Sequence, residues 1–500
     1  MQIFATEKIR AWDEYTIQHE PIASIDLMER AATACFDWIT QQGFQNKSFS
    51  VYCAKGNNGG DGLAIARMLS QAGHRVAVNI IEFGHKGTED FQTNLARLHE
   101  TPAEIKFISA ENAINPPPPG DILIDALYGS GLNRPLDGLS ARLVAQINES
   151  GQPVIAIDIP SGLFVDRSSR GNTIVKATHT LTFQCYKPAL LLPENAEYFG
   201  EVHVLDIGLH PGFLENNSSN LRWIDAAMVQ SILRPRKKFS HKGDFGHAAL
   251  AAGSTGMMGA AILCARACLR SGVGKLTVHI PSSAISIMQT AVPEAMCKVE
   301  EGTGYITAFS SPEKYQAIGI GPGLGQHDLH AALMEYIFQH YHRPLVIDAD
   351  GLNVLAKHNW LLNKIPNNSI LTPHPKEFER LFGKTGDDFQ RLALALEKAA
   401  FHKIIIVLKG HFSFIATPEG IGYFNSTGNA GMATGGTGDV LTGILTALIA
   451  QGYDPREAAV AGTHIHGLAG DMAASMISPE AMVASDIVDY LGAAFSQLVH

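Results

Sequence analysis

A glycine-rich segment at 427–445, TGNAGMATGGTGDVLTGIL, leads directly into apolar residues at helical spacing. The first turn of such a helix has backbone N–H groups without internal partners, and the helix dipole adds partial positive charge, so this junction suits a phosphate group. Asp439 stands at the junction, where a carboxylate can take a proton from a hydroxyl that attacks a bound phosphate. The alternative for this stretch alone is a glycine-rich helix start that Asp439 merely caps.

A second glycine-rich loop, GNNGGDG at 56–62, follows the β-branched and aromatic run SFSVYCA and precedes a helical pattern. A strand, a glycine loop and a helix in this order are typical of a nucleotide site. The loop has neither the GxGxxG of dinucleotide-binding proteins nor the GK[ST] of a P-loop, so it supports neither of those classes. Its polar side chains are Asn57, Asn58 and Asp61.

Polar or glycine-rich residues follow three predicted strands of the first half. They are the loop 57–61, Asp125 with the nearby GSGLNRP, and Asp158 with PSG. The carboxyl ends of parallel strands meet at one edge of a sheet, so we expect these residues to converge. One aspartate at a strand end more often caps a loop than catalyses a reaction, but three together favour a site.

Predicted strands and helices alternate along both halves, which indicates an α/β protein. In the first half the alternation is typical of a Rossmann-like doubly wound parallel sheet. Strands that end in polar or glycine-rich turns recur at 317, 344, 369 and 403, so we expect a second α/β domain. The polar, aperiodic segment HPGFLENNSSN at 210–220 predicts a linker between domains 1–212 and 222–500.

Composition narrows the class of protein. A chain of 500 residues with 46% hydrophobic residues is too long for one ordinary hydrophobic core. Its formal net charge is -10 and it has no stripe of basic and aromatic residues, which argues against nucleic acid as a partner. Six cysteines without a CxxC motif indicate buried, reduced thiols in a cytoplasmic protein. The sequence has no signal-peptide core and no apolar run of membrane-spanning length, so we expect a soluble protein without a membrane partner.

The motifs GNNGGDG, DALYGSGLNRP and DIPSG resemble those of NAD(P)H-hydrate epimerases, in the same order and over nearly all of the first half. The resemblance implies catalysis by Asp158 and a potassium ion on Asn58, Asp125 and Ser161, whose oxygen atoms suit a hard monovalent cation better than zinc. Tyr128 and Ser130 depart from the residues more usual in that family. The resemblance places the hydrated nicotinamide nucleotide on Asn57, Asn58, Gly59, Gly60, Asp61, Gly129, Ser130, Gly131, Leu132, Asn133, Arg134, Pro135 and Asp158.

Lys187 follows the predicted strand HTLTFQC and is a candidate for a second catalytic group. An exposed lysine at a strand end is the favoured interpretation of its position.

From about residue 236 onward the chain resembles the ribokinase-like NAD(P)H-hydrate dehydratases, on the motifs KGDFGHAALAAGS, GPGLG, DADGLN, TPHPKEF, LKGHFS and GNAGMATGGTGDVLTG. The resemblance implies that ADP or ATP, with magnesium, binds to Lys409, Gly410, His411, Phe412, Ser413 and Gly438. It places the hydrated nicotinamide beside Ala261, Gly323, His374 and Asp439. Asp439 would be the base that deprotonates the ring hydroxyl, which is phosphorylated before phosphate departs. His464 and His466, on an apolar helical pattern, are interpreted as packing groups, or as groups that support the residues of a site, rather than as a metal pair.

Two other functions fit parts of these patterns. The GTGD junction also serves simple ribokinase-like kinases of small molecules, and the first half can be a non-catalytic binding module. The sequence leaves open the choice between ADP and ATP, between NADH and NADPH hydrates, and the epimerisation mechanism. We expect a homo-oligomer.

Overall fold

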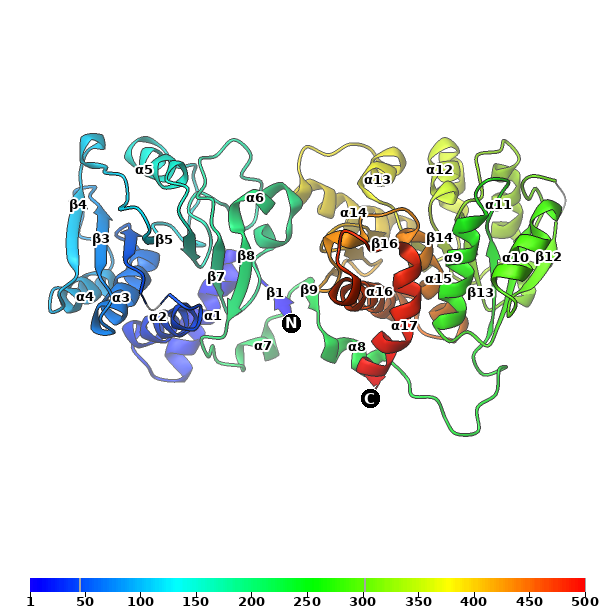
Figure 1. Ribbon diagram of the computed structural model, residues 1–500, viewed down its shortest axis with the longest axis horizontal. Helices are drawn as coiled ribbons and strands as arrows, with labels where there is room; N and C mark the ends of the chain where they lie inside the picture. The colour runs from blue at the N-terminus through cyan, green and yellow to red at the C-terminus, as the bar shows by residue number, and fades with distance from the viewer. Residues whose placement is uncertain (45, 301–302, 500) are drawn as a thin grey trace. The chain divides into compact units, whose positions relative to one another are not determined.

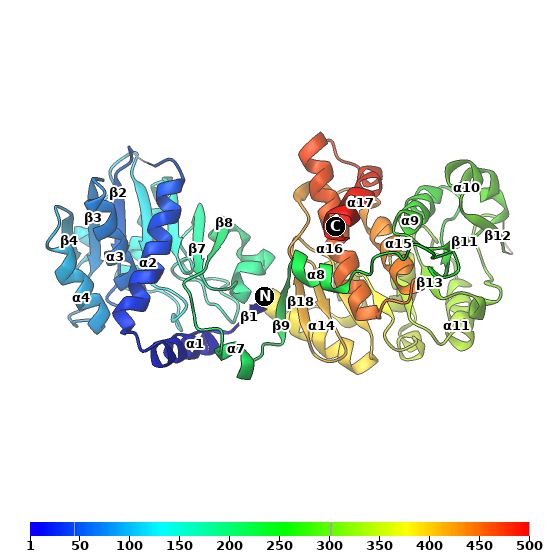
Figure 2. The ribbon, with the colours of Figure 1, turned by 90° about the horizontal axis from the view of Figure 1, so that it is seen from below.

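The computed structural model describes residues 1–44, 46–300 and 303–499. The chain divides into two compact units, one built mainly from Gln2–Ser219 and the other mainly from Asn220–Gly386 and the residues from Gln390 onward. This division falls at the end of the segment where the sequence predicts a linker. Figures 1 and 2 show the elements of both units.

The first unit contains a sheet of seven strands in the order β4-β3-β2-β5-β6-β7-β8, and every neighbouring pair is parallel. The chain builds outward from β2 to β4 and then returns to place β5 beside β2. This reversal opens a crevice at the carboxyl ends of β2 and β5, which is where ligands bind in such sheets. The strands are β2 (Phe49–Cys53), β3 (Val76–Ile81), β4 (Glu104–Ile108), β5 (Ile122–Ala126), β6 (Val154–Ile157), β7 (His179–Phe183) and β8 (Glu201–Leu205).

Helices cover both faces of this sheet because successive strand residues point to opposite sides. Val51 and Ile124 join one apolar core with the helices α2, α3 and α4, whereas Tyr52 and Leu123 join a second core with α5. The first unit also includes the short strand β1 (Gln2–Ile3). Its helices are α1 (Thr6–His19), α2 (Ser24–Gln41), α3 (Asn57–Gln71), α4 (Glu89–Leu98), α5 (Gly138–Glu149), α6 (Ala196–Phe199) and α7 (Phe213–Asn216).

The second unit contains a mixed sheet in which strands follow the order β9-β18-β17-β16-β15-β14-β13-β10-β11-β12. The pairs from β16 to β12 are parallel, while β17 is antiparallel to both β16 and β18. The strand order again reverses, here between β10 and β13. The strands are β9 (Leu221–Ile224), β10 (His247–Ala251), β11 (Lys275–Ile280), β12 (Met296–Val299), β13 (Ala317–Ile320), β14 (Leu345–Ile347), β15 (Ile370–Leu371), β16 (Ile405–Leu408), β17 (Phe414–Ala416) and β18 (Gly422–Asn425).

One face of this sheet shares a large apolar core with α9, α15, α16 and α17, and α11 and α14 lie on the other side (Figure 2). Gly443 lets α15 approach α9 closely, because a Cβ there would lie 2.2 Å from the Cys264 carbonyl oxygen. The helices are α8 (Ala226–Ile232), α9 (Met258–Arg270), α10 (Ile285–Ala291), α11 (His330–His340), α12 (Asp350–Lys357), α13 (Pro375–Phe382), α14 (Asp388–His402), α15 (Thr437–Ala450), α16 (Pro455–Ile477) and α17 (Ala484–Val499).

The predicted linker is partly structured. Its residues include the short helix α7, and Phe213 is buried against Trp12 of α1 with ring centroids 5.5 Å apart. The stacked pair packs this segment against α1, within one apolar cluster. All six cysteines are free thiols. Among the described residues, no helix has the length and apolar character needed to cross a membrane.

Candidate active sites

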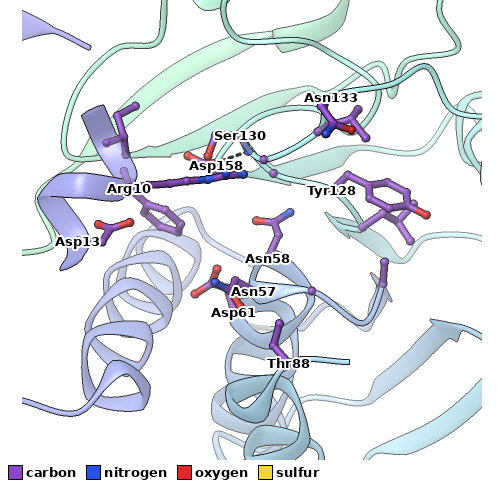
Figure 3. A pocket seen from close by; sticks show the side chains of 18 of the residues that line it. Arg10, Asp13, Asn57, Asn58, Asp61, Thr88, Tyr128, Ser130, Asn133 and Asp158 are labelled. Atoms are coloured by element: carbon purple, nitrogen blue, oxygen red, sulfur yellow. Dashed lines mark hydrogen bonds between the residues drawn. The ribbon is translucent and has the colours of Figure 1, made fainter. Parts of the chain in front are cut away.

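A cavity of about 550 Å³ lies at the carboxyl ends of the first sheet, at the reversal between β2 and β5. The start of α3 and the loops after β5 and β6 contribute to its wall (Figure 3). Asn57 and Asn58, the first two residues of α3, line this wall, so the cavity adjoins a helix N-terminus, which is a kind of site that suits anions.

Most of the predicted substrate contacts line this cavity: Asn57, Asn58, Asp61, Gly129, Ser130, Gly131, Leu132, Asn133, Arg134 and Asp158. The other three, Gly59, Gly60 and Pro135, are not among its lining residues. Gly59 and Gly60 instead allow close packing beneath it, since a Cβ at Gly59 would lie 1.6 Å from the Ala54 carbonyl oxygen and one at Gly60 2.7 Å from the Met28 sulfur.

Asp158 is held in place from two sides. Its Oδ2 accepts a hydrogen bond from the backbone N–H of Ser130 at 2.9 Å, and its Oδ1 lies 2.9 Å from Nζ of Lys187. Burial acts to raise the pKa of Asp158, but the charge of Lys187 and these hydrogen bonds outweigh it and hold the pKa below its usual value. Asp158 is therefore an ionised carboxylate at the cavity wall.

The favoured interpretation of Lys187 as an exposed lysine is wrong. Its side chain is fully buried, and its ammonium also donates to Thr182 Oγ1 at 2.7 Å and to the Phe183 carbonyl oxygen at 2.8 Å. The chain after β7 turns back through Gln184, whose φ is 64°, and so brings Lys187 beneath Asp158.

Asp125 and Ser161 lie together but are not among the residues that line the cavity. Asp125 accepts hydrogen bonds from the Ser161 backbone N–H at 2.8 Å, from Ser161 Oγ at 2.6 Å and from the Leu127 N–H at 3.2 Å. Burial outweighs these bonds and raises the pKa of Asp125 to about 6. Asn58 comes from the facing loop, and a Cβ at Gly129 would lie 3.1 Å from its Cγ.

Two polar residues of α1 in the cavity wall, Arg10 and Asp13, were missed by the sequence analysis (Figure 3). Burial and the nearby charge of Asp158 raise the pKa of Asp13 to about 7. A Cβ at Gly131 would lie 2.7 Å from an Arg10 guanidinium nitrogen, so Arg10 reaches across to the loop after β5. The only signal for these residues was the amphipathic pattern of Ile9, Trp12 and Thr16 on the same helix, which are buried.

In the second unit, α15 begins at the glycine-rich junction around Asp439. The residue that caps this helix is Gly436, with a φ of 98°, and no side chain caps it. The interpretation of Asp439 as a mere cap is therefore wrong, since it stands in the first turn. Burial, with the charges of Asp348 and Asp350 also contributing and Lys409 opposing, raises the pKa of Asp439 to about 7. Such a carboxylate can accept and release a proton near neutral pH.

Lys409 connects the predicted nucleotide residues to this helix. Its Nζ lies 2.8 Å from Oδ1 of the buried Asp348, whose Oδ2 accepts from Thr442 Oγ1 of α15 at 2.9 Å. A Cβ at Gly438 would lie 3.2 Å from Lys409 Nζ, so the lysine sits against the backbone at the helix start. Asp348 had no predicted role, although the motif DADGLN contains it. The next residue, Ala349, has a φ of 48°, a costly conformation for a residue with a Cβ.

The other residues predicted to contact the nicotinamide, His374, Gly323 and Ala261, lie in three different structural environments. His374 caps α13, where its Nδ1 accepts from the Lys376 N–H at 3.2 Å, and burial lowers its pKa. Gly323 has a φ of 59° and accepts a hydrogen bond from Ser254 Oγ at 2.9 Å. Ala261 is fully buried in the core of α9, so its side chain gives no support to a substrate contact.

Gly410, His411, Phe412 and Ser413 form the tight turn between the antiparallel strands β16 and β17, where Ser413 Oγ donates to the Gly410 carbonyl oxygen at 3.1 Å. His464 and His466 are both buried on α16. Burial lowers the pKa of His466 to about 4, so it is uncharged at neutral pH, in agreement with a packing role.

Family profiles match both units. The profile described as YjeF-related protein N-terminus matches residues 24–189, and the profile described as NAD(P)H-hydrate dehydratase matches residues 248–492. The two matches follow the same order as the two units.

Relatives match over nearly the full length. A bifunctional NAD(P)H-hydrate repair enzyme of Moorella thermoacetica is 34% identical over 488 residues, which cover 94% of this chain and 92% of that protein. The enzyme of the same description from Escherichia coli is 33% identical over 470 residues, or 93% of this chain and 88% of that protein.

Solved structures match the second unit. The ADP/ATP-dependent NAD(P)H-hydrate dehydratase of Bacillus subtilis, co-crystallised with ATP and Mg²⁺, is 31% identical with a TM-score of 0.50 over 56% of this chain and all of that one. A ribokinase-like superfamily protein of Enterococcus faecalis gives a TM-score of 0.51 at 27% identity over 56% of this chain and 98% of that one. Two domain profiles in sequence order and full-length relatives above 30% identity thus show that the chain belongs to the family of bifunctional NAD(P)H-hydrate repair enzymes, which join an epimerase to an ADP/ATP-dependent dehydratase.

Proposed function

We propose that the cavity of the first unit interconverts the R and S hydrates of NADH or NADPH, and that the start of α15 dehydrates the S form with ADP or ATP. One observation carries the second assignment. Asp439, with a pKa of about 7, stands in the first turn of a helix that no side chain caps, beside the Lys409–Asp348 ion pair. A base and an anion site adjoin there, as phosphoryl transfer to a hydroxyl requires.

The dehydration follows from this arrangement. Hydroxide is a poor leaving group, so the hydroxyl on the sixth ring carbon is first phosphorylated. Asp439 takes the hydroxyl proton while the backbone N–H groups at the start of α15 neutralise charge on the transferred group. Phosphate then leaves from the sixth carbon, and loss of a proton from the neighbouring carbon restores the ring double bond.

The adenine nucleotide is assigned to Lys409, Gly438 and the turn 410–413. Lys409 supports this assignment because its ammonium lies against the backbone at the start of α15. The ammonium and the partial positive charge of the helix N-terminus would both attract the nucleotide phosphates there. Magnesium, when bound with the nucleotide, neutralises charge on its phosphates. The carboxylates of Asp348 and Asp350 supply oxygen atoms of the kind it prefers. His374 and Gly323 are assigned to the nicotinamide side, and Ala261 stays a prediction.

Three carboxyl groups line the epimerase cavity, and burial and neighbouring charges raise the pKa of Asp61 as well as that of Asp13, whereas the pKa of Asp158 is lowered. Asp158 stays ionised beside Lys187, whereas Asp13 holds a proton up to a pH of about 7. Environments that push two pKa values apart are typical of an acid and base pair. We assign Asp158 as the proton acceptor and Asp13 as the donor for epimerisation.

Potassium is assigned to Asn58, Asp125 and Ser161. Asp125 is buried, and among the ion pairs of the described residues none gives it a basic partner. The side chains of Asn58, Asp125 and Ser161 can offer the ion oxygen atoms only. A potassium ion, when bound, would supply the missing positive charge and fix the loop that carries Asn58.

A small-molecule kinase is the second candidate function, because the α15 junction would also serve a stable phosphorylation. The products separate the two. Incubation of the full chain with S hydrate and ATP should release one phosphate per restored dihydronicotinamide, detected by its near-ultraviolet absorbance. A stable phosphorylated hydrate without that absorbance would establish the kinase instead.

We also infer a cytoplasmic homo-oligomer with functional domains at 1–212 and 222–500. The six free cysteines support a reducing compartment. Light scattering of the purified chain tests the oligomeric state.

A further inference from the structure

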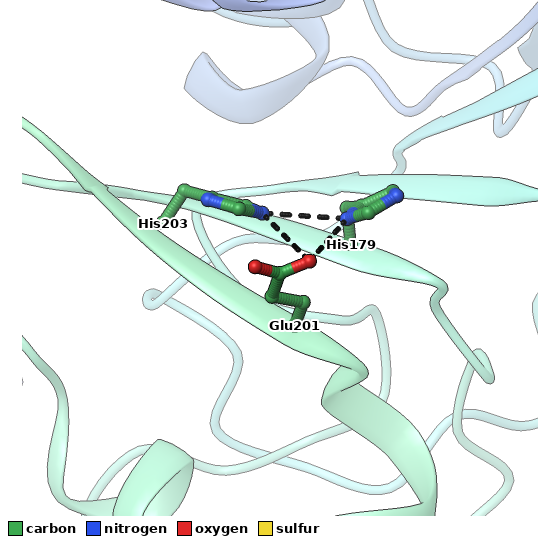
Figure 4. A group of neighbouring side chains, drawn as sticks. All are labelled: His179, Glu201 and His203. Carbon is green, nitrogen blue, oxygen red and sulfur yellow. Dashed lines mark hydrogen bonds and ion pairs between the residues drawn. The ribbon is translucent and has the colours of Figure 1, made fainter. Parts of the chain in front are cut away.

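Two histidines and a glutamate gather where β7 and β8 begin (Figure 4). His179 is the first residue of β7, and Glu201 is the first residue of β8 and pairs with it in the parallel register. His203 follows Glu201 by two residues on the same strand. Residues two apart on a strand share a face, so all three side chains project from the same side of the sheet.

The ligand atoms of these side chains converge. His179 Nδ1 lies 3.3 Å from His203 Nε2 and 3.6 Å from Glu201 Oε2, and the His203 to Glu201 distance is 3.8 Å. Nitrogen and oxygen ligands of tetrahedral zinc lie about 2.0–2.2 Å from the ion, which places them roughly 3.3–3.6 Å from one another. Of the histidine, cysteine and acidic side chains in the described part of the chain, no other three meet in this way.

The surroundings hold the two imidazole rings in place for metal binding. The Trp38 ring of α2 packs on both histidines, at 5.1 Å from His179 and 4.6 Å from His203 between ring centroids. This contact limits the rotation of both rings, while the glutamate side chain is 70% exposed and leaves one side open to water.

We propose that His179, Glu201 and His203 bind one divalent transition-metal ion of zinc's class, with water completing its coordination. Two imidazoles and one carboxylate select such an ion over potassium or magnesium, which prefer oxygen ligands. The site lies at the amino ends of β7 and β8, whereas Phe183 and Gln184 at the other end of β7 line the epimerase cavity. The ion therefore takes no part in epimerisation and instead ties the edge strand β8 to its neighbour.

The test uses the full chain, stripped with a chelator and titrated with Zn²⁺ by calorimetry. Wild type should bind one equivalent that is lost in His203→Ala and Glu201→Gln, with the dissociation constant raised by at least about 100-fold, more than the loss of an outer-shell partner causes. His99→Ala removes an exposed histidine that directly follows α4 and should leave that equivalent unchanged.

One further measurement, the absorption spectrum with Co²⁺, tests the same three ligands. Co²⁺ added to wild type should give the visible absorption of tetrahedral cobalt bound to nitrogen and oxygen, which Glu201→Gln weakens. Because Glu201 is exposed, this variant tests the site even where His203→Ala fails to fold. A stoichiometry that is the same in wild type and both variants would overturn the proposal. It would show that the histidines share only the hydrogen bond between their rings.

Discussion

Lys187 Nζ lies 2.9 Å from Asp158 Oδ1, and the lysine has no exposed surface at all. A buried ion pair of this kind contributes little net stability, but removal of one partner leaves an uncompensated charge. The pair therefore keeps the cavity carboxylate both ionised and fixed in position.

Lys187→Met should destabilise the first unit by about 3–5 kcal/mol and raise the pKa of Asp158. The rate of epimerisation should fall because the carboxylate of Asp158 is no longer held ionised and in position. The rate of dehydration of pure S hydrate should be retained. Chemical denaturation and epimer exchange by NMR measure the two effects. Lys176→Met is the matched control, because Lys176 pairs with Glu197 on the surface. Equal effects of the two variants would refute the role of the buried pair.

Asp439→Asn should lower the rate of dehydration by about 10²–10⁴-fold, because it removes a general base without altering the start of α15. Binding of ATP, measured by calorimetry, should be nearly unchanged. Turnover close to that of wild type would exclude Asp439 as the base.

The pH profile of dehydration tests the same residue independently. The base must be ionised, and its pKa is about 7. The rate should therefore rise as the pH increases through 7 and level off above it. A rate that is constant from pH 5.5 to 8.5, under saturating nucleotide, would contradict this assignment.

Asp125→Ala should remove the monovalent cation site and reduce epimerisation while it spares the second unit. The melting temperature of wild type should rise in potassium chloride relative to lithium chloride at equal ionic strength, and the variant should show no such difference. If the two salts act alike on wild type, Asp125 serves only to join its loop to Ser161.

A fragment of residues 1–219 should fold and interconvert the epimers without nucleotide. The shorter fragment 1–212 lacks Phe213, which stacks on Trp12, and should be less stable by about 3 kcal/mol. Thermal unfolding of both fragments provides the comparison. Equal stability would show that α7 contributes nothing to the first unit.

Parts of both sites follow from the sequence because parallel strands end at one edge. Asn57, Asn58, Asp61 and Asp158 line one cavity for that reason, whereas Asp125 is hydrogen-bonded to Ser161 and is not among the lining residues. The glycines before Asp439 predict the start of α15. Lys187 was misjudged as exposed because the backbone takes positive φ values at Asp158 and at Gln184, close to the point where the side chains of Asp158 and Lys187 meet. Local sequence patterns do not reveal such conformations.

Arg10 and Asp13 were missed for a different reason. They belong to α1, which is far along the chain from the glycine-rich loops, and only tertiary packing brings that helix to the cavity. Asp348 lay within a recognised motif, but its contacts with Lys409 and Thr442 join three separate segments. Side-chain pairs of this kind depend on the fold rather than on spacing.

The assignment of epimerisation to the first unit and of dehydration to the second is tested most directly with a mixture of R and S hydrates, which the full chain repairs in the presence of ATP and magnesium. Wild type should restore the near-ultraviolet absorbance of all the reduced cofactor, with one phosphate released per molecule. Asp158→Asn should restore only the S fraction at the wild-type rate and leave the R fraction to slow spontaneous exchange. Complete and equally fast repair by Asp158→Asn, or no recovery of absorbance by wild type, would contradict the account.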